Sequence, residues 1–297
     1  MAIDLRNVPQ NKQNYEMCLA SVKVNGQQLE FVREDLQTQE LCLAAITTNR
    51  WDSDILSYVK VQTPEICLAA VKQNGTALEY VQNQTFELCL AAVKQSGLAL
   101  AYVKNQTPEI CLTAIRRWPF AIQYVKAQTP EMCFEAVRQD GRALAYVKNQ
   151  TPVICLAAAE QNGYALKYIK NQTPEICLAA VRKWGNALQF VKDQTPELCL
   201  EAVKNDGCAL RYAKDQTPEL YLEAVKQNGM ALGYIPKRKQ TLPIAIAALK
   251  QEPYSRKYLA AKFRTPEVYK AAGYDYKPED LADSRSSTER ERTEPGH

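Results

Sequence analysis

The chain repeats one sequence pattern with a fixed period of 22, and this period constrains its fold more than any other feature. A Thr-Pro-Glu motif starts at Thr63, and the equivalent threonine returns at Thr85, at Thr107 and then at the same interval as far as Thr217. A fixed period of this size is typical of repeat proteins, in which each unit buries its apolar side against its neighbours. Looser copies of the pattern begin at Asn14, Thr38, Thr241 and Thr265.

Each repeat is predicted to form two helices. Thr is a good N-cap, Pro suits the first helical position, and the Glu that follows favours the positive end of a helix dipole. The helix that begins at Thr63 should end at Asn74-Gly75, where we expect Gly to adopt the left-handed conformation. The segment 76–82, TALEYVQ, then predicts a second helix of about two turns, although its aromatic and β-branched residues leave a β-strand as the alternative. The fold class predicted is all-α, an α-solenoid (superhelix) of short antiparallel helix hairpins.

Changes in the pattern divide the chain into four parts. Pro236 and the basic residues after it break the repeat, and the polar string ADSRSSTERERTEPGH cannot bury enough apolar surface to order itself. We therefore expect an N-terminal extension over 1–13, a solenoid of about ten units over 14–235, a helical capping subdomain over 236–280 and a disordered tail over 281–297.

Nine of the ten cysteines occupy one position of the repeat, inside the first helix and among apolar residues. A free Cys in such a place acts as a small hydrophobe, and reduced thiols fit a cytosol. The only histidine is His297, so the usual zinc ligand sets and the commonest general base are missing. We expect no catalytic residue, no cofactor and no metal, and hence no enzyme. The nine are Cys18, Cys42, Cys67, Cys89, Cys111, Cys133, Cys155, Cys177 and Cys199.

Nothing in the sequence points to a membrane. No apolar run approaches the roughly 20 residues that cross a bilayer, and the first residues lack the basic and apolar regions of a Sec signal peptide. The net charge of +4 neither demands nor excludes an acidic partner.

Two ladders of side chains admit both a structural and a functional interpretation. An aromatic residue recurs in the second helix, at Phe31, at Tyr58 and then once in every repeat from Tyr80 to Tyr234, either as packing between repeats or as a stacking surface for bases or a peptide. A row of lysines follows it and could track phosphates. A row of glutamates starts five residues later, so we expect the charges to complement the helix ends and one another. The lysines are Lys60, Lys104, Lys126, Lys148, Lys170, Lys192 and Lys214.

Positions that vary between repeats are candidates for specificity, because fixed positions are those that every hairpin needs for stacking. One such site lies on the first helix, where Ala69 gives way to Thr113 and Glu135. Two others lie after the turn Gly and in the second helix. We expect all three to face solvent. The candidates among them are Arg142, Tyr164, Lys167 and Arg211.

The three tryptophans all lie at turns between helices, each preceded by a basic residue. Their spacings of 67 and 66 residues equal about three repeats, which favours a common edge. Trp and Arg dominate interface hot spots, so these turns could anchor an acidic partner surface. The alternative is that each Trp folds over its own turn and covers the next repeat. The candidate residues are Trp51, Arg116, Arg117, Trp118, Arg182, Lys183 and Trp184.

The string LAAVKQNG followed by ALxYV resembles a repeat family called domain of unknown function 4116. The resemblance covers about residues 14–235, and the regular period of 22 is slightly shorter than is usual there. It implies a helical repeat of intracellular bacteria, including effectors delivered into host cells, with no catalytic residue to transfer. The Glu-rich C-terminus resembles the recognition tails of type IV secretion substrates.

These observations together favour a non-enzymatic scaffold for protein–protein interaction. We expect a monomer made in a bacterial cytoplasm and then delivered to the host cytosol, which binds a host protein or another effector along its solenoid surface. The alternatives are a nucleic-acid-binding helical repeat that uses the lysine row, which we regard as less favoured, and an enzyme with an unrecognised site.

Overall fold

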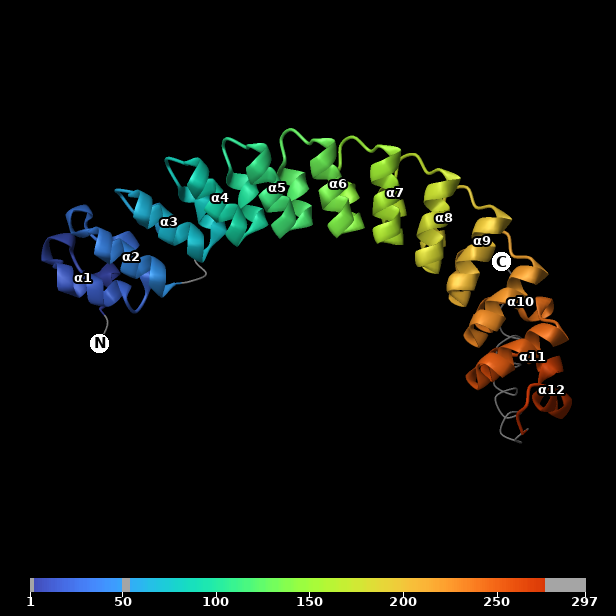
Figure 1. Ribbon diagram of the computed structural model, residues 1–297. Helices are drawn as coiled ribbons and strands as arrows, with labels where there is room; N and C mark the ends of the chain where they lie inside the picture. The colour runs from blue at the N-terminus through green and yellow to red at the C-terminus, as the bar shows by residue number, and fades with distance from the viewer. Residues whose placement is uncertain (1–2, 50–53, 276–297) are drawn as a thin grey trace, which may run out of the picture. The chain divides into compact units, whose positions relative to one another are not determined.

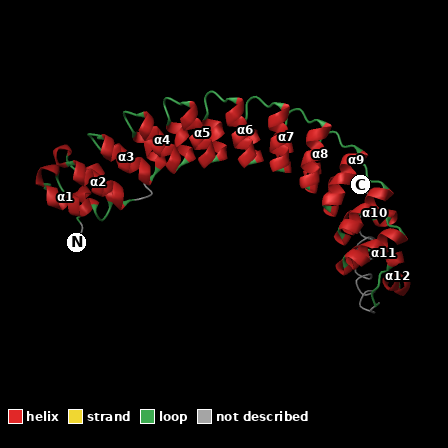
Figure 2. Cartoon of the chain, viewed as in Figure 1, coloured by secondary structure: helices red, strands yellow, loops and turns green. Residues whose placement is uncertain are grey.

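The computed structural model describes residues 3–49 and 54–275 (Figure 1). These residues form α-helices and 3-10 helices joined by short loops, and no strand occurs among them (Figure 2). The predicted all-α solenoid is therefore confirmed, and the β-strand alternative for the second helix of each repeat does not hold.

The chain divides into two compact units, residues 1–149 and 150–297. Within each unit the α-helices pack against one another in one layer, and the 3-10 helices, written η, pack in a second layer. The first unit contains η1 Leu5–Asn7, η2 Gln10–Lys12, α1 Tyr15–Val22, η3 Gly26–Phe31, η4 Glu34–Leu36, α2 Gln39–Thr48, η5 Asp54–Tyr58, α3 Pro64–Gln73, η6 Gly75–Tyr80, α4 Phe86–Gln95, η7 Gly97–Tyr102, α5 Pro108–Arg117, η8 Pro119–Tyr124, α6 Pro130–Gln139 and η9 Gly141–Tyr146.

The second unit continues the same alternation of helix types. It contains α7 Pro152–Gln161, η10 Gly163–Tyr168, α8 Pro174–Lys183, η11 Gly185–Phe190, α9 Pro196–Asn205, η12 Gly207–Tyr212, α10 Pro218–Gln227, η13 Gly229–Tyr234, η14 Lys237–Lys239, α11 Leu242–Gln251, η15 Pro253–Tyr258, η16 Ala261–Phe263 and α12 Pro266–Ala271. The alternation thus passes residue 235, where the sequence motif weakens. Residues 276–297, with the predicted tail, lie outside the described residues.

The start of each regular α-helix is the one predicted. The Oγ1 of Thr63 accepts a hydrogen bond from the Ile66 N–H at 3.3 Å, and Pro64 occupies the first helical position. The same bond recurs at Thr85, Thr107, Thr129, Thr151, Thr173, Thr195 and Thr217. A donor that the helix would leave unpaired is satisfied in this way at every repeat.

The turn between the two helices differs from the prediction. Asn74 is extended, with φ −139° and ψ 109°, and its side chain caps the second helix by accepting from the Thr76 N–H. Among the described residues only Gly273 has positive φ, so the left-handed glycine expected at each turn is wrong.

Close approach of two repeats explains the glycine instead. A Cβ placed on Gly75 would lie 2.4 Å from the carbonyl oxygen of Ala92, in the next repeat. Real Cβ atoms do not tolerate such a distance, because it lies far inside van der Waals contact. The same clash with the next repeat's alanine carbonyl recurs at Gly97, Gly163, Gly185, Gly207 and Gly229. The glycine therefore allows the 3-10 layer to lie directly on the neighbouring α-helix.

The second helix is a 3-10 helix of six residues, which has the predicted length of two turns but a tighter winding. Its Ala77 and Leu78 are buried with Val81, which follows it, and so are Ala70 and Val71 of the α-helix. Within each unit the core is thus a seam between the two layers, built from a few small and branched side chains per repeat.

A glutamine at the end of most repeats joins the repeat to the next one. The Nε2 of Gln84 donates to the carbonyls of Leu78 at 3.3 Å and Tyr102 at 2.9 Å. Its Oε1 accepts from the Lys104 N–H at 3.0 Å and, more weakly, from the Cys89 thiol at 3.7 Å. One side chain therefore satisfies backbone groups of two successive hairpins. We call this residue the clamp glutamine.

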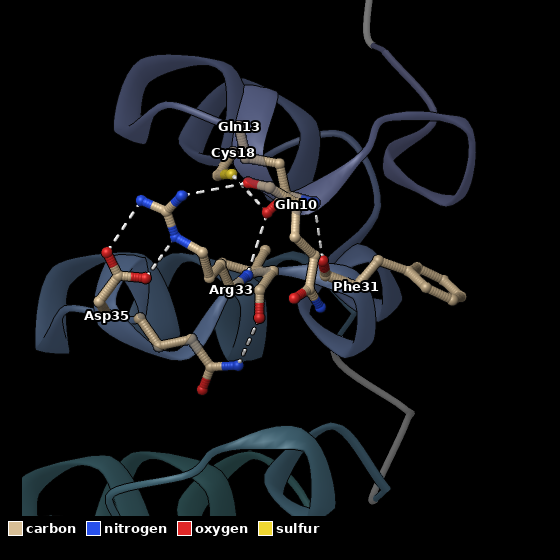
Figure 3. A network of polar contacts seen from close by, with 8 residues as sticks. Gln10, Gln13, Cys18, Phe31, Arg33 and Asp35 are labelled. Atoms are coloured by element: carbon tan, nitrogen blue, oxygen red, sulfur yellow. Dashed lines mark hydrogen bonds and ion pairs between the residues drawn. The ribbon is translucent and has the colours of Figure 1, made fainter.

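The clamp begins at the first repeat, where Gln13 bonds the Phe31 carbonyl and the Arg33 N–H (Figure 3). There the Arg33 guanidinium also contacts the Gln10 carbonyl and pairs with Asp35. Gln240 makes the equivalent bonds to Tyr258 and Ala260 beyond the regular array. The other residues that bond a carbonyl and an N–H of the next hairpin in this way are Gln62, Gln106, Gln128, Gln150, Gln172 and Gln194.

Candidate interaction surface

The predicted site residues occupy three places in the repeat. One place is the end of the α-helix, which holds Arg116, Arg117, Arg182 and Lys183. The second is the capping position between the two helices, which holds Trp118 and Trp184. The third is the 3-10 helix, which holds Arg142, Tyr164, Lys167 and Arg211. Trp51 lies outside the described residues.

Each described tryptophan replaces the residue that normally caps the 3-10 helix. Neither makes a side-chain capping bond, so its ring is free to lie along the surface. Trp118 is half-buried, with its ring centroid 5.9 Å from that of Phe120 and 6.3 Å from that of Tyr124. In the first unit the tryptophan ring thus packs over the 3-10 helix that follows it.

Trp184, in the second unit, keeps 44% of its surface exposed. Its ring lies 6.4 Å from Tyr164 of the preceding repeat, and Tyr164 in turn lies 5.6 Å from Phe190. Rings at these distances contribute about 0.5–1.5 kcal/mol per pair beyond their buried area. The three residues form an aromatic cluster that is held in place yet open to solvent.

Three of the predicted basic residues already have carboxylate partners. Arg182 contacts Glu201 of the next repeat at 2.9 Å, and the equivalent Arg116 lies 3.9 Å from Glu135. Arg142 pairs with Asp140 at 2.6 Å, and its guanidinium holds the pKa of that carboxyl below the usual range. The glutamates at the variable site of the α-helix are half-buried, so this site does not simply face solvent as expected.

The remaining basic candidates lie exposed, with no carboxylate within 4 Å among the residues that the structure describes. They are Arg117, Lys183, Lys167 and Arg211.

Two of these cations lie on tyrosine rings of the aromatic ladder. The Arg211 guanidinium lies 4.4 Å from the Tyr212 centroid and 6.0 Å from that of Tyr234, and it donates to the Tyr212 hydroxyl. The Lys167 ammonium lies 5.8 Å from the Tyr168 ring. Cation–π contact of this kind fixes a long side chain above the ring. The ladder rings are half-exposed or exposed rather than buried in the core, so they both pack and form surface.

Lysines of the row form hydrogen bonds within the chain. The Lys126 Nζ donates to the Lys104 carbonyl at 2.9 Å, and the same bond to the preceding repeat occurs at Lys104, Lys148, Lys192 and Lys214. No ion pair joins this row to the glutamate row within the described ranges. The lysines instead satisfy carbonyl oxygens at the end of the 3-10 layer.

Sequence reasoning missed two sets of residues. The clamp glutamines have a clear signal, since a Gln stands before every regular Thr from Thr63 to Thr217. Lys257, which lies 4.9 Å from the Tyr258 ring, repeats the basic-aromatic dipeptides at 167–168 and 211–212.

A cavity of about 340 Å³ lies between the first turns of α3 and α4 in the first unit, lined by Pro64, Cys67, Leu68 and Leu88 among others. Its counterpart between α8 and α9 in the second unit is smaller, about 150 Å³. Burial raises the pKa of the Cys67 thiol, which keeps it protonated and unreactive near neutral pH.

The described part of the chain shows neither a group of metal ligands nor a membrane-spanning helix. It contains no group of three or more His, Cys, Asp or Glu residues placed to hold a metal ion. It also contains no helix long and apolar enough to span a bilayer.

The comparisons with known proteins identify the repeat but no activity. The family model described as "Domain of unknown function (DUF4116)" matches two adjacent copies, residues 173–216 and 217–264. The predicted resemblance to this repeat family is thereby confirmed, and the second copy extends past residue 235 into the region of α11 and η15. No curated protein and no solved structure matches the chain.

Proposed function

We propose that this protein is a non-enzymatic scaffold that binds another protein along its repeat surface. The observation that carries the proposal is the cluster of Trp184, Tyr164 and Phe190, which exposes a tryptophan on a fixed support. The chain's repeated side chains are used to hold the hairpins together, whereas the Trp and Tyr of this cluster stand at positions that vary between repeats. Exposed Trp beside basic residues is typical of interface hot spots.

The biological setting proposed is that of an effector, or of a regulator of another effector, that acts as a monomer. The resemblance to a repeat family found in effectors supports this setting, and so does the polar, Glu-containing C-terminal sequence. The proposal places the protein first in a bacterial cytoplasm and then, after type IV secretion, in the host cytosol. Its partner is a host protein or a second effector, and it acts by covering a partner's active site or by bridging two proteins.

Nucleic-acid binding is the second candidate, and the lysine row was its basis. Five of those lysines donate to backbone carbonyls of the preceding repeat, which draws the ammonium groups toward the chain. A complex of this second kind would weaken steeply as salt rises, because phosphate binding releases counterions. A protein interface centred on Trp184 should depend on salt much less.

The first prediction concerns the exposed tryptophan. Proteins captured from host lysate and from the bacterium's secreted fraction should lose affinity for the Trp184→Ala variant by about 30-fold, the effect of a hot-spot truncation of about 2 kcal/mol. Dissociation constants of the purified pairs measure this. Phe134→Ala is the matched control, since Phe134 is 40% exposed but lies on the α-helical layer of the first unit. If Trp184→Ala and Trp118→Ala both leave every captured interaction at full strength, the proposed surface is wrong.

A further inference from the structure

The 3-10 layer of the second unit differs from that of the first unit in charge. Its helices η10, η11, η12, η13 and η15 contain no Asp or Glu. The fifth residue of each of these helices is Lys167, Gln189, Arg211, Gly233 and Lys257. The equivalent residues in the first unit are Glu30, Ser57, Glu79, Ala101, Gln123 and Ala145. At this fifth position a cation therefore occurs in every second repeat of the second unit and in no repeat of the first unit.

Each of these three cations is exposed and lies over the aromatic ring that follows it in sequence. The distances to the centroids of Tyr168, Tyr212 and Tyr258 are 5.8, 4.4 and 4.9 Å. Around Arg211 the guanidinium also donates to the Tyr212 hydroxyl, so donors from two residues converge at one point of the surface. A carboxylate is the group that such a set of donors binds best.

Apolar and aromatic side chains flank the cations. Residues three positions earlier lie in the same row of a 3-10 helix, and they include Tyr164, Met230 and the 70% exposed Tyr254. The row beside the cations is therefore suited to apolar side chains of a partner.

The acidic residues closest in sequence to these helices lie outside the helices, either at the capping position or on the loop that follows. Asp206 and Glu252 cap η12 and η15 by accepting from backbone N–H groups, which holds their carboxylates at the helix starts. Asp193 and Asp215 follow η11 and η12, on the loops that lead to α9 and α10. The helices between these acidic residues present a basic and aromatic surface.

We infer that this surface, the 3-10 layer from η10 to η15, binds an extended acidic segment of a partner protein. The inference rests on the proposed scaffold function and specifies the partner's chemistry. Neighbouring helices pack about 8–10 Å apart, so cations at every second repeat lie about 16–20 Å apart. An extended chain advances about 3.3 Å per residue, which puts an acid at every fifth or sixth residue with apolar residues between.

A nucleic-acid strand fits this surface less well. Each strand of a duplex carries one phosphate per 3.4 Å or so of the helix axis, far more densely than the cations here. Bases stack on open aromatic faces, whereas Lys167, Arg211 and Lys257 already lie over the ring faces. Sparse cations separated by apolar rows match a protein segment of mixed composition.

The test uses the full chain and two fluorescent peptides of identical composition. One peptide carries three Glu-Glu pairs five residues apart in a Gly, Ser and Leu background, and the other carries the same six glutamates in one block. The triple variant Lys167→Gln, Arg211→Gln, Lys257→Gln removes the proposed contacts. A control triple variant, Lys204→Gln, Lys226→Gln, Lys250→Gln, removes the same charge from the α-helical layer of the same unit.

The spaced peptide should bind the unaltered chain more tightly than the block peptide, and the first triple variant should weaken it by at least about tenfold. The control triple variant should change its binding by less than about twofold, because exposed charges away from the contact act only at long range. Equal losses in the two triple variants would overturn the inference, since attraction would then follow net charge alone.

Two further outcomes separate this inference from its alternatives. If an oligothymidine binds the chain more tightly than the spaced peptide does, and the first triple variant loses that binding, the inference is overturned in favour of nucleic acid. A captured partner that depends on Trp184 but binds the first triple variant normally would refute this inference and leave the scaffold function standing.

Discussion

At the scale of single residues, each repeat assigns separate tasks to its small and polar side chains. Gly75 allows the next repeat's carbonyl to approach, Thr63 caps the α-helix, and Asn74 caps the 3-10 helix. The cysteine of the α-helix fills space at the seam between hairpins, where its thiol is buried. Burial disfavours the thiolate, because a charge in an apolar environment loses its hydration.

Because the thiols are buried, the free energy of unfolding should depend on pH in the alkaline range. Burial raises the pKa of Cys42 to about 11, whereas its ordinary value is 9.0. A group whose pKa is higher in the folded chain contributes stability below its unfolded pKa and loses it as the pH rises toward the folded pKa. Between pH 8 and pH 10.5 the free energy of unfolding should therefore fall, and Cys42 alone should contribute about 1–2 kcal/mol of that fall. Urea denaturation of the native chain and of Cys42→Ala at both pH values measures it, and identical pH slopes for the two proteins would contradict it.

At the scale of elements, the stability of a hairpin comes from its contacts with the neighbouring hairpin more than from its own two helices. Helices of six and ten residues are too short to persist alone in water. The clamp glutamine supplies the directional part of the joint, since it bonds carbonyls of both hairpins and one N–H. The buried seam supplies the larger, non-directional part.

Two glutamines of the second unit, one a clamp and one not, allow the contribution of the clamp to stability to be measured by itself. Gln172 is a clamp that bonds Leu166, Phe190 and Lys192, whereas Gln189 lies exposed on η11 and bonds only within its own helix. We expect Gln172→Ala to lower the free energy of unfolding by about 1–3 kcal/mol, because it leaves backbone groups unpaired. Gln189→Ala should change it by less than about 0.5 kcal/mol. Denaturant titration of both variants checks the difference, and a loss at Gln189 as large as that at Gln172 would refute the role of the clamp.

The sequence predicted the elements better than it predicted their joints. Thr63, Pro64 and the period of 22 were sufficient to place the α-helices, since capping acts within one turn. The reason for Gly75 depends on an atom of the next repeat, the Ala92 carbonyl oxygen, which local rules do not include. For the same reason the ion pairs of Arg116 and Arg182 could not be predicted, because their carboxylate partners lie one repeat further on.

At the scale of the whole molecule, the central claim is that one period of the sequence forms a complete building block. The block of residues 151–172, for example, brings one cap of each kind, one close-contact glycine and one clamp. Such a block needs only a similar block on each side. Repeat arrays of this kind gain stability from each unit and each interface in turn. Surface residues such as Lys167 and Trp184 then vary without altering the blocks.

Removal of one block is the most direct test. A chain that lacks residues 173–194 joins Gln172 to Thr195, which restores every junction of the pattern. Its circular dichroism per residue should match that of the full chain, and it should still unfold in a cooperative transition, because the new neighbours meet in the old register. A chain that lacks only residues 173–183 deletes α8 but keeps η11, and it should lose that cooperative transition. Loss of cooperative folding when the whole block 173–194 is removed, or equal tolerance of both deletions, would contradict the account.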